Sequence, residues 1–535
     1  MRVHLRLLKV GSMAESLGIF VPAMVLQKAL GLARVLLFAH LVSQAEYGLW
    51  GMGLMIFLVA SPVATLGANH GLTRYVSLYE ARGQLAAFYR RVQGRCVIAA
   101  LAATAVGMAA SKWITDLVIV SGSGASAAIF TYRHQLYVCL AALANVLVGA
   151  LYHDMLSFMF GMRAYRLASA AELAFSVVFT IFGLAAVAIQ PSAVALLVAH
   201  FAAQAIVLAA GVAALQAALK YAEGYQSPRA DWQPTEADAA AGEAAVPPSG
   251  AVSRVPVEAL DSAFTRVLRF GFVAMIGNIM WLAAQSVSLY LTNRRCGKED
   301  AAIFSALLQL SQAVLIVSNS AFAVVFAHTA RRWEGPSRPA AMALLETAYK
   351  ALTIAMMALT IAVFAAAPLW VKLLRAEYHI GLTLLGGMLM SFQAVSNLSL
   401  LTAVVRLRER PIVIALCALA GGAANVALAL WWMPRFAYAP AGAAWASGAG
   451  MLVGGTAVAI GYFVVAGVRL RPATYVLMAC PVLLVLPAWA AAAVWAAVIV
   501  AARVTPLLFD SHEKRTLAHV ASRYAMRLRR ALPWQ

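Results

Sequence analysis

The chain has 535 residues, of which 63% are hydrophobic and only 12% charged, and its mean hydropathy is +0.81. A water-soluble domain cannot bury so much apolar surface, and about twice this charged fraction is usual in soluble proteins. Lys and Arg outnumber Asp and Glu by 41 to 21, an excess that we interpret as orientation signals and lipid contacts rather than as a nucleic-acid surface.

Apolar segments of about 20 residues recur along the chain, and each is long enough to cross about 30 Å of hydrocarbon. The first is too long for a cleaved signal, so we expect a retained helix with a cytoplasmic start. Twelve spans are predicted at 16–39, 46–68, 93–111, 135–152, 170–189, 192–215, 267–291, 302–327, 346–367, 380–404, 411–432 and 442–465. Prolines punctuate the apolar block 473–509, which predicts two short or tilted spans there.

The positions of the basic residues favour fourteen spans, with both termini cytoplasmic, over twelve. With the N-terminus inside and two final spans, eight of the 41 Lys and Arg fall outside: Lys112, Arg133, Arg294, Arg295, Lys298, Lys372, Arg375 and Arg435. Basic loops prefer the cytoplasmic side of a membrane. A single final span would instead place the basic segment 510–535 outside. The predicted architecture is therefore an all-α, polytopic helical bundle.

One polar segment, 216–265, divides this bundle. It holds seven of the 21 acids and five prolines, and its apolar residues do not follow a helical period. This composition predicts a disordered cytoplasmic linker, and the alternative is a docking motif for a partner. The predicted organisation is an N-terminal lobe with helices 1–6 (1–215), a C-terminal lobe with helices 7–12 (266–466), helices 13–14 (467–509) and a basic cytoplasmic tail (510–535).

A weak internal repeat supports two similar lobes. The stretch "SQAEYGLWGM" (43–52) aligns with "GKEDAAIFSA" (297–306), an offset that superposes the first span on the seventh. Pseudo-symmetric halves joined by a long inside segment are typical of secondary transporters, whose substrate site lies in a central cavity between the halves.

The first span carries two cations, Lys28 and Arg34. A charge at the bilayer centre costs about 2.5–3.5 kcal/mol on insertion scales, so such residues persist where they meet a cavity, a partner or a ligand. At 100° per residue, Gln27, Gly31 and Arg34 fall within about a third of the helix circumference that includes Lys28. We expect Lys28 to face a wet cavity, whereas Arg34 either does the same or reaches the outer headgroups.

Amide side chains form stripes on the seventh and eighth spans. Asn278 and Gln285 lie on one face of the seventh, and Gln312 and Asn319 on one face of the eighth. Amides can bind sugar hydroxyls as donor and acceptor together, or hold helices against one another. Both interpretations are open for each residue.

Signals for covalent chemistry are absent from the sequence. It contains no phosphate-binding glycine loop and no metalloprotease, redox or hydrolase motif, so neither an enzyme nor a cofactor is expected. A coupling ion, H⁺ or Na⁺, would require a buried acid. Glu172 at the start of the fifth span is the best candidate, since Asp154 and Asp116 are predicted near helix ends.

Three motifs carry a family resemblance. The first is "ALGLARVLLFAHLVSQAEYGLWGMG", with Glu46, Tyr47 and Gly48; the second is "LGANHGLTRYVSLYEARG", with Gly67, Gly71, Arg74 and Tyr75; the third is "SFMFGMRAYRLASAAEL", with Gly161, Arg163 and Tyr165. In their order and spacing they resemble Wzx-type O-antigen or capsule flippases, of the multidrug/oligosaccharidyl-lipid/polysaccharide (MOP) exporter superfamily. The similarity covers the first 170 residues or so, and the second motif is expected as a loop.

The resemblance implies two lobes of twelve to fourteen helices in the bacterial inner membrane, with alternating access. The implied substrate is an undecaprenyl-pyrophosphate-linked oligosaccharide, and polysaccharide polymerases or glycosyltransferases are implied as neighbours. Lys28, Arg34 and Arg74 would then meet the pyrophosphate, while the amides meet the sugars. Rival interpretations are a peptidoglycan-precursor flippase, a cation-coupled drug exporter, a membrane glycan polymerase or ligase, and a scaffold without transport.

Overall fold

The computed structural model describes residues 13–81, 84–120, 131–162, 164–224, 261–333, 338–408, 410, 412–515, 517, 518 and 522. Its first half contains α2 (Met13–Leu41), α3 (Gln44–Ala64), α4 (Ala68–Ala81), α5 (Leu85–Ala109), α6 (Ser111–Ile114), η1 (Thr115–Ile119), α7 (Tyr132–Gly161), α8 (Tyr165–Ile189) and α9 (Ala193–Gly224). The second half contains α11 (Asp261–Cys296), α12 (Lys298–Trp333), α13 (Arg338–Val371), η5 (Ala376–Gly381), α14 (Leu382–Asn397), α15 (Ser399–Leu407), α16 (Ile412–Trp432), α17 (Ala439–Gly450), η6 (Met451–Gly455), α18 (Thr456–Val465), α19 (Pro472–Ala479), η7 (Cys480–Val485) and α20 (Ala488–Val504). These residues contain no strand, which confirms the all-α prediction.

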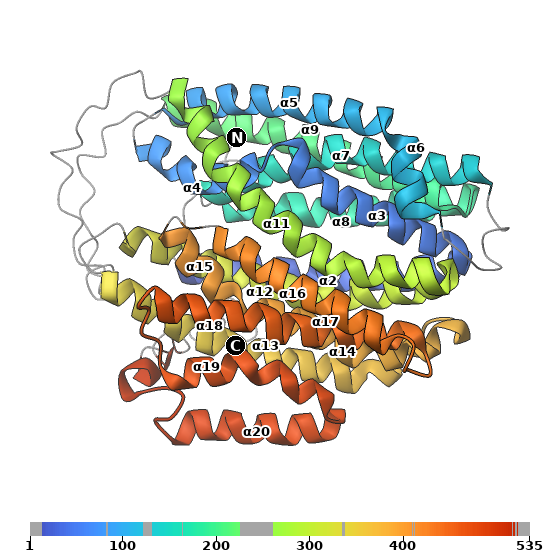
Figure 1. Cartoon of the computed structure of the whole chain (residues 1–535). Helices are drawn as coiled ribbons and strands as arrows, with labels where there is room; N and C mark the ends of the chain where they lie inside the picture. Colours follow the sequence, from blue (N-terminus) through green and yellow to red (C-terminus); the bar gives the residue numbers. More distant parts are fainter. Residues whose placement is uncertain are drawn as a thin grey trace, which may run out of the picture.

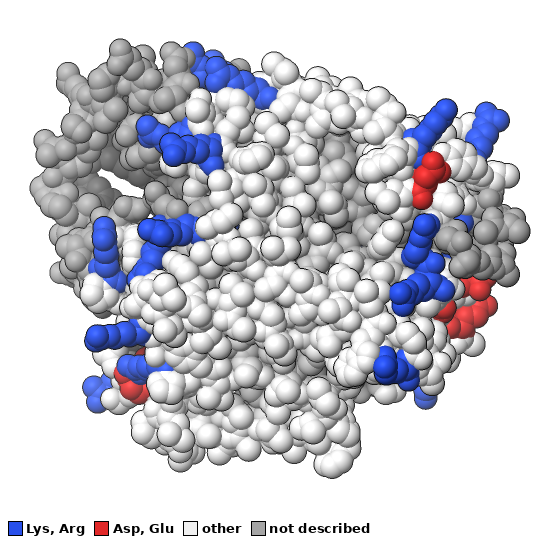
Figure 2. All heavy atoms as spheres, in the orientation of Figure 1, with Lys and Arg blue, Asp and Glu red and all other residues white. Residues whose placement is uncertain are grey.

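The described helices form a membrane-spanning bundle. Eleven of them are long and apolar enough to cross a bilayer, and two shorter apolar helices cover Pro472–Val485 and Ala488–Val504. Figure 2 shows Lys and Arg at two opposite ends of one face, with an uncharged band between them. The chain is therefore a multi-pass membrane protein, whereas the count of fourteen spans stays a prediction.

Two ends of the bundle need names. The linker end, at the left of Figure 1, is where α9 stops and α11 starts; the opposite end is the sealed end. Residues 225–260, most of the predicted linker, lie outside the described residues. The flanking helices extend past the predicted linker bounds of 216 and 265, since α9 continues to Gly224 and α11 begins at Asp261.

The same helix pairings occur in both halves. In the first half α2 packs on α8, α3 on α7, and α9 on both α7 and α8. In the second half α11 packs on α16, α12 on α14, and α17 on both α14 and α16. The fold therefore consists of two pseudo-symmetric lobes, with α19, η7 and α20 added against α13 and α14 at the edge of the second (Figure 1).

The two lobes share one hydrophobic core at the sealed end and have separate cores at the linker end. The shared core contains Phe38 and Trp50 of the first lobe together with Phe304 and Tyr378 of the second. At the linker end, one core lies among α4, α5, α7, α8 and α9, and another among α12, α13, α15, α16 and α18. Apart from the first turns of α11, burial of apolar surface thus joins the lobes at the sealed end.

Helix α11 crosses between the lobes. Most of it packs on α16, but its first turns pack on α4, where Val267 enters the core of the first lobe. The crossing requires glycine at Gly67, which has φ +72° and no room for a Cβ, since that atom would lie 2.2 Å from the carbonyl oxygen of Gly271. A side chain there would be strained by both backbone conformation and collision.

The Glu46-Tyr47-Gly48 triplet forms the seal between the lobes. Glu46 stays within the first lobe, where its carboxylate accepts a hydrogen bond from the backbone N–H of Ala193 (2.7 Å) and lies 3.0 Å from a ring nitrogen of His134. Tyr47 is fully buried, and its ring meets that of Tyr378 at 6.4 Å between centroids. A Cβ on Gly48 would lie 2.3 Å from the carbonyl oxygen of Lys298. The two stretches aligned by the internal repeat therefore contact each other across the lobe boundary.

After α20, the chain folds back as a terminal latch, residues 505–515. The Glu513 carboxylate lies 2.6 Å from Nζ of Lys350 on α13 and 2.9 Å from the guanidinium of Arg471. The latter also pairs with Asp510 at 2.7 Å. Because the side chain of Lys350 is fully buried, the latch supplies the carboxylate that its charge needs. The start of the predicted tail 510–535 is thus docked on α13.

We expect Glu513→Ala to destabilise the protein by about 3–5 kcal/mol, because it leaves the buried ammonium of Lys350 without a carboxylate. The double variant Lys350→Met/Glu513→Leu should recover most of this loss, since it buries no charge. Unfolding of the purified protein in detergent, followed by helical circular dichroism, measures both. A double variant no more stable than Glu513→Ala would contradict the pairing as the cause.

Gly48→Ala is expected to open the seal, because overpacking at a backbone contact costs about 1–3 kcal/mol. Ser305, a buried residue whose hydroxyl faces Gly51, provides a reporter position. The reporter protein carries Ser305→Cys, with half-buried Cys296 changed to Ser. Its cysteine at 305 should react with a membrane-impermeant maleimide roughly tenfold faster when Gly48→Ala is added than when Gly48 is kept. Gly94→Ala is the control, since nothing lies within 4 Å of its Cβ. Equal labelling in both variants would show that Gly48 does not hold the seal.

Candidate functional site

A cavity lies between helices of the two halves. Its volume is about 140 Å³, and its walls come from α3, α4 and α7 of the first lobe and from α11. Its lining residues are Phe57, Leu58, Ser61, Pro62, Thr65, Asn69, Ala150, His153, Asn278 and Leu282. None of these described residues is acidic, so the cavity offers neutral hydrogen-bonding groups on an apolar wall. We call it the interlobe cavity.

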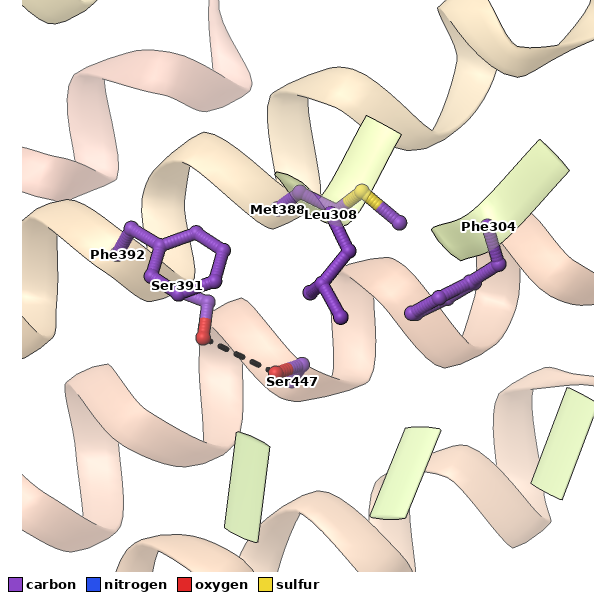
Figure 3. A pocket seen from close by; sticks show the side chains of 6 residues that line it. All are labelled: Phe304, Leu308, Met388, Ser391, Phe392 and Ser447. Carbon is purple, nitrogen blue, oxygen red and sulfur yellow. Dashed lines mark hydrogen bonds between the residues drawn. The ribbon is translucent and has the colours of Figure 1, made fainter. Parts of the chain in front are cut away.

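A second pocket is too small to hold a substrate. Figure 3 shows it between α12, α14 and α17, where Ser391 and Ser447 point at one another across a 3.0 Å hydrogen bond. Its volume of about 10 Å³ is close to the minimum that one water requires. A substrate path is therefore better sought at the interlobe cavity.

At the linker end, a neutral histidine and an unpaired cation belong to opposite lobes. His70 lies on α4 next to Asn69 of the cavity wall, and Arg406 lies on α15. Burial of the imidazole, and then the positive charge of Arg406, lower the pKa of His70 to about 3. The buried Nε2 of His70 has no hydrogen-bond partner. Arg406 is half-buried and forms no hydrogen bond or ion pair with any described residue.

Arg34, a predicted site residue, packs against α8. Its guanidinium donates to the backbone oxygen of Ser176 (3.3 Å) and lies 4.4 Å from the ring centre of Phe179, a cation–π contact. This placement differs from the alternative in which Arg34 reaches outer headgroups. One hydrogen bond uses only part of the five donors of an arginine, so Arg34 keeps donors for a ligand.

The other predicted residues divide into described and undescribed side chains. Asn278 lines the interlobe cavity. Gln27 has a buried Oε1 without a partner, and Gln312 is half-buried on α12. The side chains of four residues lie outside the described part of the chain, so their roles stay predictions: Lys28, Arg74, Gln285 and Asn319.

Sequence reasoning missed His70 and Arg406 and ranked Asp154 below Glu172, in each case because an element was ended too early. The motif at 66–83 was expected as a loop, but α4 is a helix from Ala68 to Ala81. The span predicted to end at 152 continues as α7 to Gly161, which makes Asp154 an interior residue with 0% exposure. Similarly, the span predicted to end at 404 continues through Arg406. Helix-forming residues beyond each predicted end were the available signal.

Comparison with known proteins finds similar structures but no similar sequences. No family model matches the chain, and no curated protein matches it. Among solved structures, an inward-facing multidrug resistance MATE family transporter of the MOP superfamily is similar with a TM-score of 0.57 and 12% identity, covering 83% of this chain and 96% of that one.

Two further solved structures are similar to nearly the same extent. The lipid II flippase MurJ, in an inward closed conformation, gives a TM-score of 0.56 at 11% identity, over 91% of this chain and 99% of that one. A MOP superfamily transporter from Pyrococcus furiosus Vc1, whose binding pocket is described as having reverse polarity, gives 0.53 at 12% identity, over 87% and 97%. At these identities the likeness shows the fold alone: the chain has the fold of MOP-superfamily transporters.

Proposed function

We propose that the protein is a transporter that moves a polyprenyl-pyrophosphate-linked oligosaccharide across the bacterial inner membrane, from the cytoplasmic leaflet to the periplasmic leaflet. The observation that carries the proposal is the guanidinium of Arg406, which pairs with no described residue and acts electrostatically on His70 of the opposite lobe. Both lie at the linker end of two lobes whose interlobe cavity has no described acid in its wall. An anion bound there removes an electrostatic cost that the protein alone leaves uncompensated.

The chemistry of a pyrophosphate suits this arrangement. Arginine binds phosphate oxygens in a bidentate fashion, and such charge-assisted hydrogen bonds are stronger inside a low-dielectric site than in water. A neutral His70 can donate or accept one hydrogen bond beside the anion. Lys28, Arg34 and Arg74 are proposed as further cationic ligands. Asn278, with Gln27, Gln285, Gln312 and Asn319, is proposed to meet the sugars while the polyprenyl tail stays in lipid.

Alternating access is supported by how the lobes pack. They share a core at the sealed end and have separate cores at the linker end, where α11 crosses between them. We assign the linker end to the cytoplasm, because this places most basic residues inside. The substrate would enter from the cytoplasmic leaflet while the periplasmic end is closed.

An exporter of lipophilic cations is disfavoured, because such a ligand would be drawn to acidic groups and the described wall of the interlobe cavity has none. A peptidoglycan-precursor flippase would carry the same anionic lipid with a different glycan. A membrane glycan polymerase or ligase lacks a sequence motif to support it. As partners of the transporter, we propose glycosyltransferases that build the lipid-linked glycan or polymerases that use it.

The test uses cells in which the chromosomal gene is deleted and variants are supplied in trans. Deletion should abolish surface polysaccharide and leave lipid-linked repeat units at the cytoplasmic leaflet, measured by extraction and by protection from a periplasmic glycosidase. Normal surface glycan with raised drug sensitivity would identify a drug exporter. Normal surface glycan with accumulated peptidoglycan precursor would identify the other flippase.

In these cells, Arg406→Gln should reduce surface glycan by roughly 10–100-fold at equal expression, since a hydrogen bond to a charged group contributes about 1.5–3 kcal/mol. Arg406→Lys should retain part of the activity because it keeps the charge but not the bidentate geometry. Arg435→Gln, an exposed arginine on the α16–α17 loop, is the matched control. Wild-type glycan in the Arg406→Gln strain would remove Arg406 from the mechanism.

His70 predicts a pH dependence of stability. Its folded pKa lies below the ordinary value, so the unfolded chain binds the proton more readily and the folded state loses stability as pH falls from about 6.5 towards 3. At pH 5.5 the loss from this residue is about 1 kcal/mol. Thermal unfolding at pH 7.5 and 5.5 should therefore show a smaller fall for His70→Asn than for the wild type. An equal fall would mean that His70 is already water-accessible.

A further inference from the structure

Asp154 is a fully buried acid that the proposed substrate site does not use. It lies on α7 with 0% exposure, and neither carboxyl oxygen has a hydrogen-bond partner. The thiol of Cys96 on α5 and the hydroxyl of Thr65 lie beside the carboxyl group, but without acceptable hydrogen-bond geometry. The phenol oxygen of Tyr89, also on α5 and electrostatically close, is buried without a partner as well.

Among the described residues, no cation and no hydrogen-bond donor pairs with a carboxylate in this position. Burying an unpaired ion costs far more than burying a neutral polar group, and membrane interiors increase the cost. No described ion pair includes Asp154. The group therefore requires either a bound proton or a bound cation.

The neighbours of Asp154 suit a proton better than a metal cation. Hard cations take several oxygen ligands, whereas the closest side chains here supply one thiol and one hydroxyl. Among the described residues, no group of three or more His, Cys, Asp or Glu side chains could hold a metal ion. Protonation of a single carboxyl oxygen needs no such set.

The interlobe cavity adjoins this carboxyl group. Thr65 lies in the cavity wall and beside Asp154, and the preceding residue, His153, lines the same cavity. Titratable groups on the elements that pack around α7 include Glu46 on α3, His70 on α4, Tyr89 and Cys96 on α5, Asp116 on η1, Glu172 on α8 and His200 on α9. Glu172, the acid that the sequence favoured, lies near Tyr152 rather than in the cavity wall.

We propose that Asp154 is the proton-binding site that couples transport to opening of the interlobe cavity. With the cavity closed, the carboxyl O–H bond is intact and the group is neutral. When the cavity fills with water, that bond breaks, the proton passes to water as hydronium, and water stabilises the remaining carboxylate. Coupling rests on the proposed transport function, whereas proton binding itself does not.

Proton uptake by the purified full-length protein in weakly buffered detergent tests the site directly. On acidification from pH 8 to pH 5, the wild type should take up about one more proton per chain than Asp154→Asn, whose neutral amide has nearly the same shape as the protonated acid. Asp116→Asn is the matched control, because it makes the same change at an acid that is exposed on η1. Equal uptake by wild type and Asp154→Asn overturns the proposal.

Cys96 provides a second measurement in the same protein. In a variant that keeps Cys96 as its one cysteine, N-ethylmaleimide labelling should rise between pH 6 and pH 8 more steeply with Asp154 than with Asn at that position, because the carboxylate draws water into the site. The Asn variant corrects for ionisation of the thiol itself. Identical pH profiles, or release of the proton on addition of sodium ions, would overturn proton coupling at Asp154.

Transport in cells separates this inference from the proposed function. Asp154→Asn should reduce surface glycan at least tenfold and leave the midpoint of unfolding unchanged. Asp116→Asn should leave the amount of surface glycan unchanged. If gene deletion leaves glycan export normal but the proton count still differs, the proposed function fails and the proton site stands. If deletion blocks export but the proton counts are equal, the proton site fails alone.

Discussion

The arrangement of the two lobes depends on a backbone contact at the sealed end. Gly48 on α3 lies against the carbonyl of Lys298 on α12, and around this contact Tyr47, Trp50 and Tyr378 form one core with both lobes. Apolar burial of this kind is non-directional, so the close backbone approach fixes where the lobes meet. At the linker end a similar backbone approach occurs where α11 crosses, at Gly67 and Gly271, whereas the larger hydrophobic cores of the lobes remain separate there.

Two ionisable groups inside the bundle are accommodated by contacts within the protein, and two others are not. Lys350 is paired with a carboxylate supplied by the terminal latch. Arg34 uses a backbone carbonyl and an aromatic face. Arg406 and Asp154 have neither arrangement among the described residues. The first two arrangements explain stability, whereas the last two leave electrostatic costs that a ligand can remove, and we therefore base both proposals on them.

Composition and the internal repeat predicted the helical membrane class and the two-lobe arrangement, because both depend on apolar patterning that the chain displays directly. Helix ends were less predictable. The pair His153–Asp154 lowers hydropathy, so α7 was ended at 152, although packing against other helices of the lobe carries it to Gly161. A polar residue can lie inside a membrane helix when it faces protein rather than lipid. Hydropathy alone cannot distinguish such a residue from one at the end of the helix.

The candidate site was predicted only in part for the same reason. The helical stripes correctly grouped polar residues on single helices, and Asn278 does line the interlobe cavity. However, a site between lobes depends on which faces of different helices meet, and periodicity within one helix does not contain that information. His70 and Arg406, 336 positions apart in the chain, become electrostatic neighbours only through the fold.

The proposed anion and proton sites belong to different mechanical parts of the molecule. Asp154 lies within the first lobe, on α7, whereas Arg406 lies in the second, on α15. A ligand held by Arg406 and by wall residues such as Asn69 would bridge the lobes at the linker end. If the backbone contact holds the sealed end in place, drawing the linker end together would change the width of the interlobe cavity, and with it the access of water to Thr65 and Asp154. A coupling free energy between the two sites then requires no direct contact between substrate and proton, only one lobe movement that both of them bias.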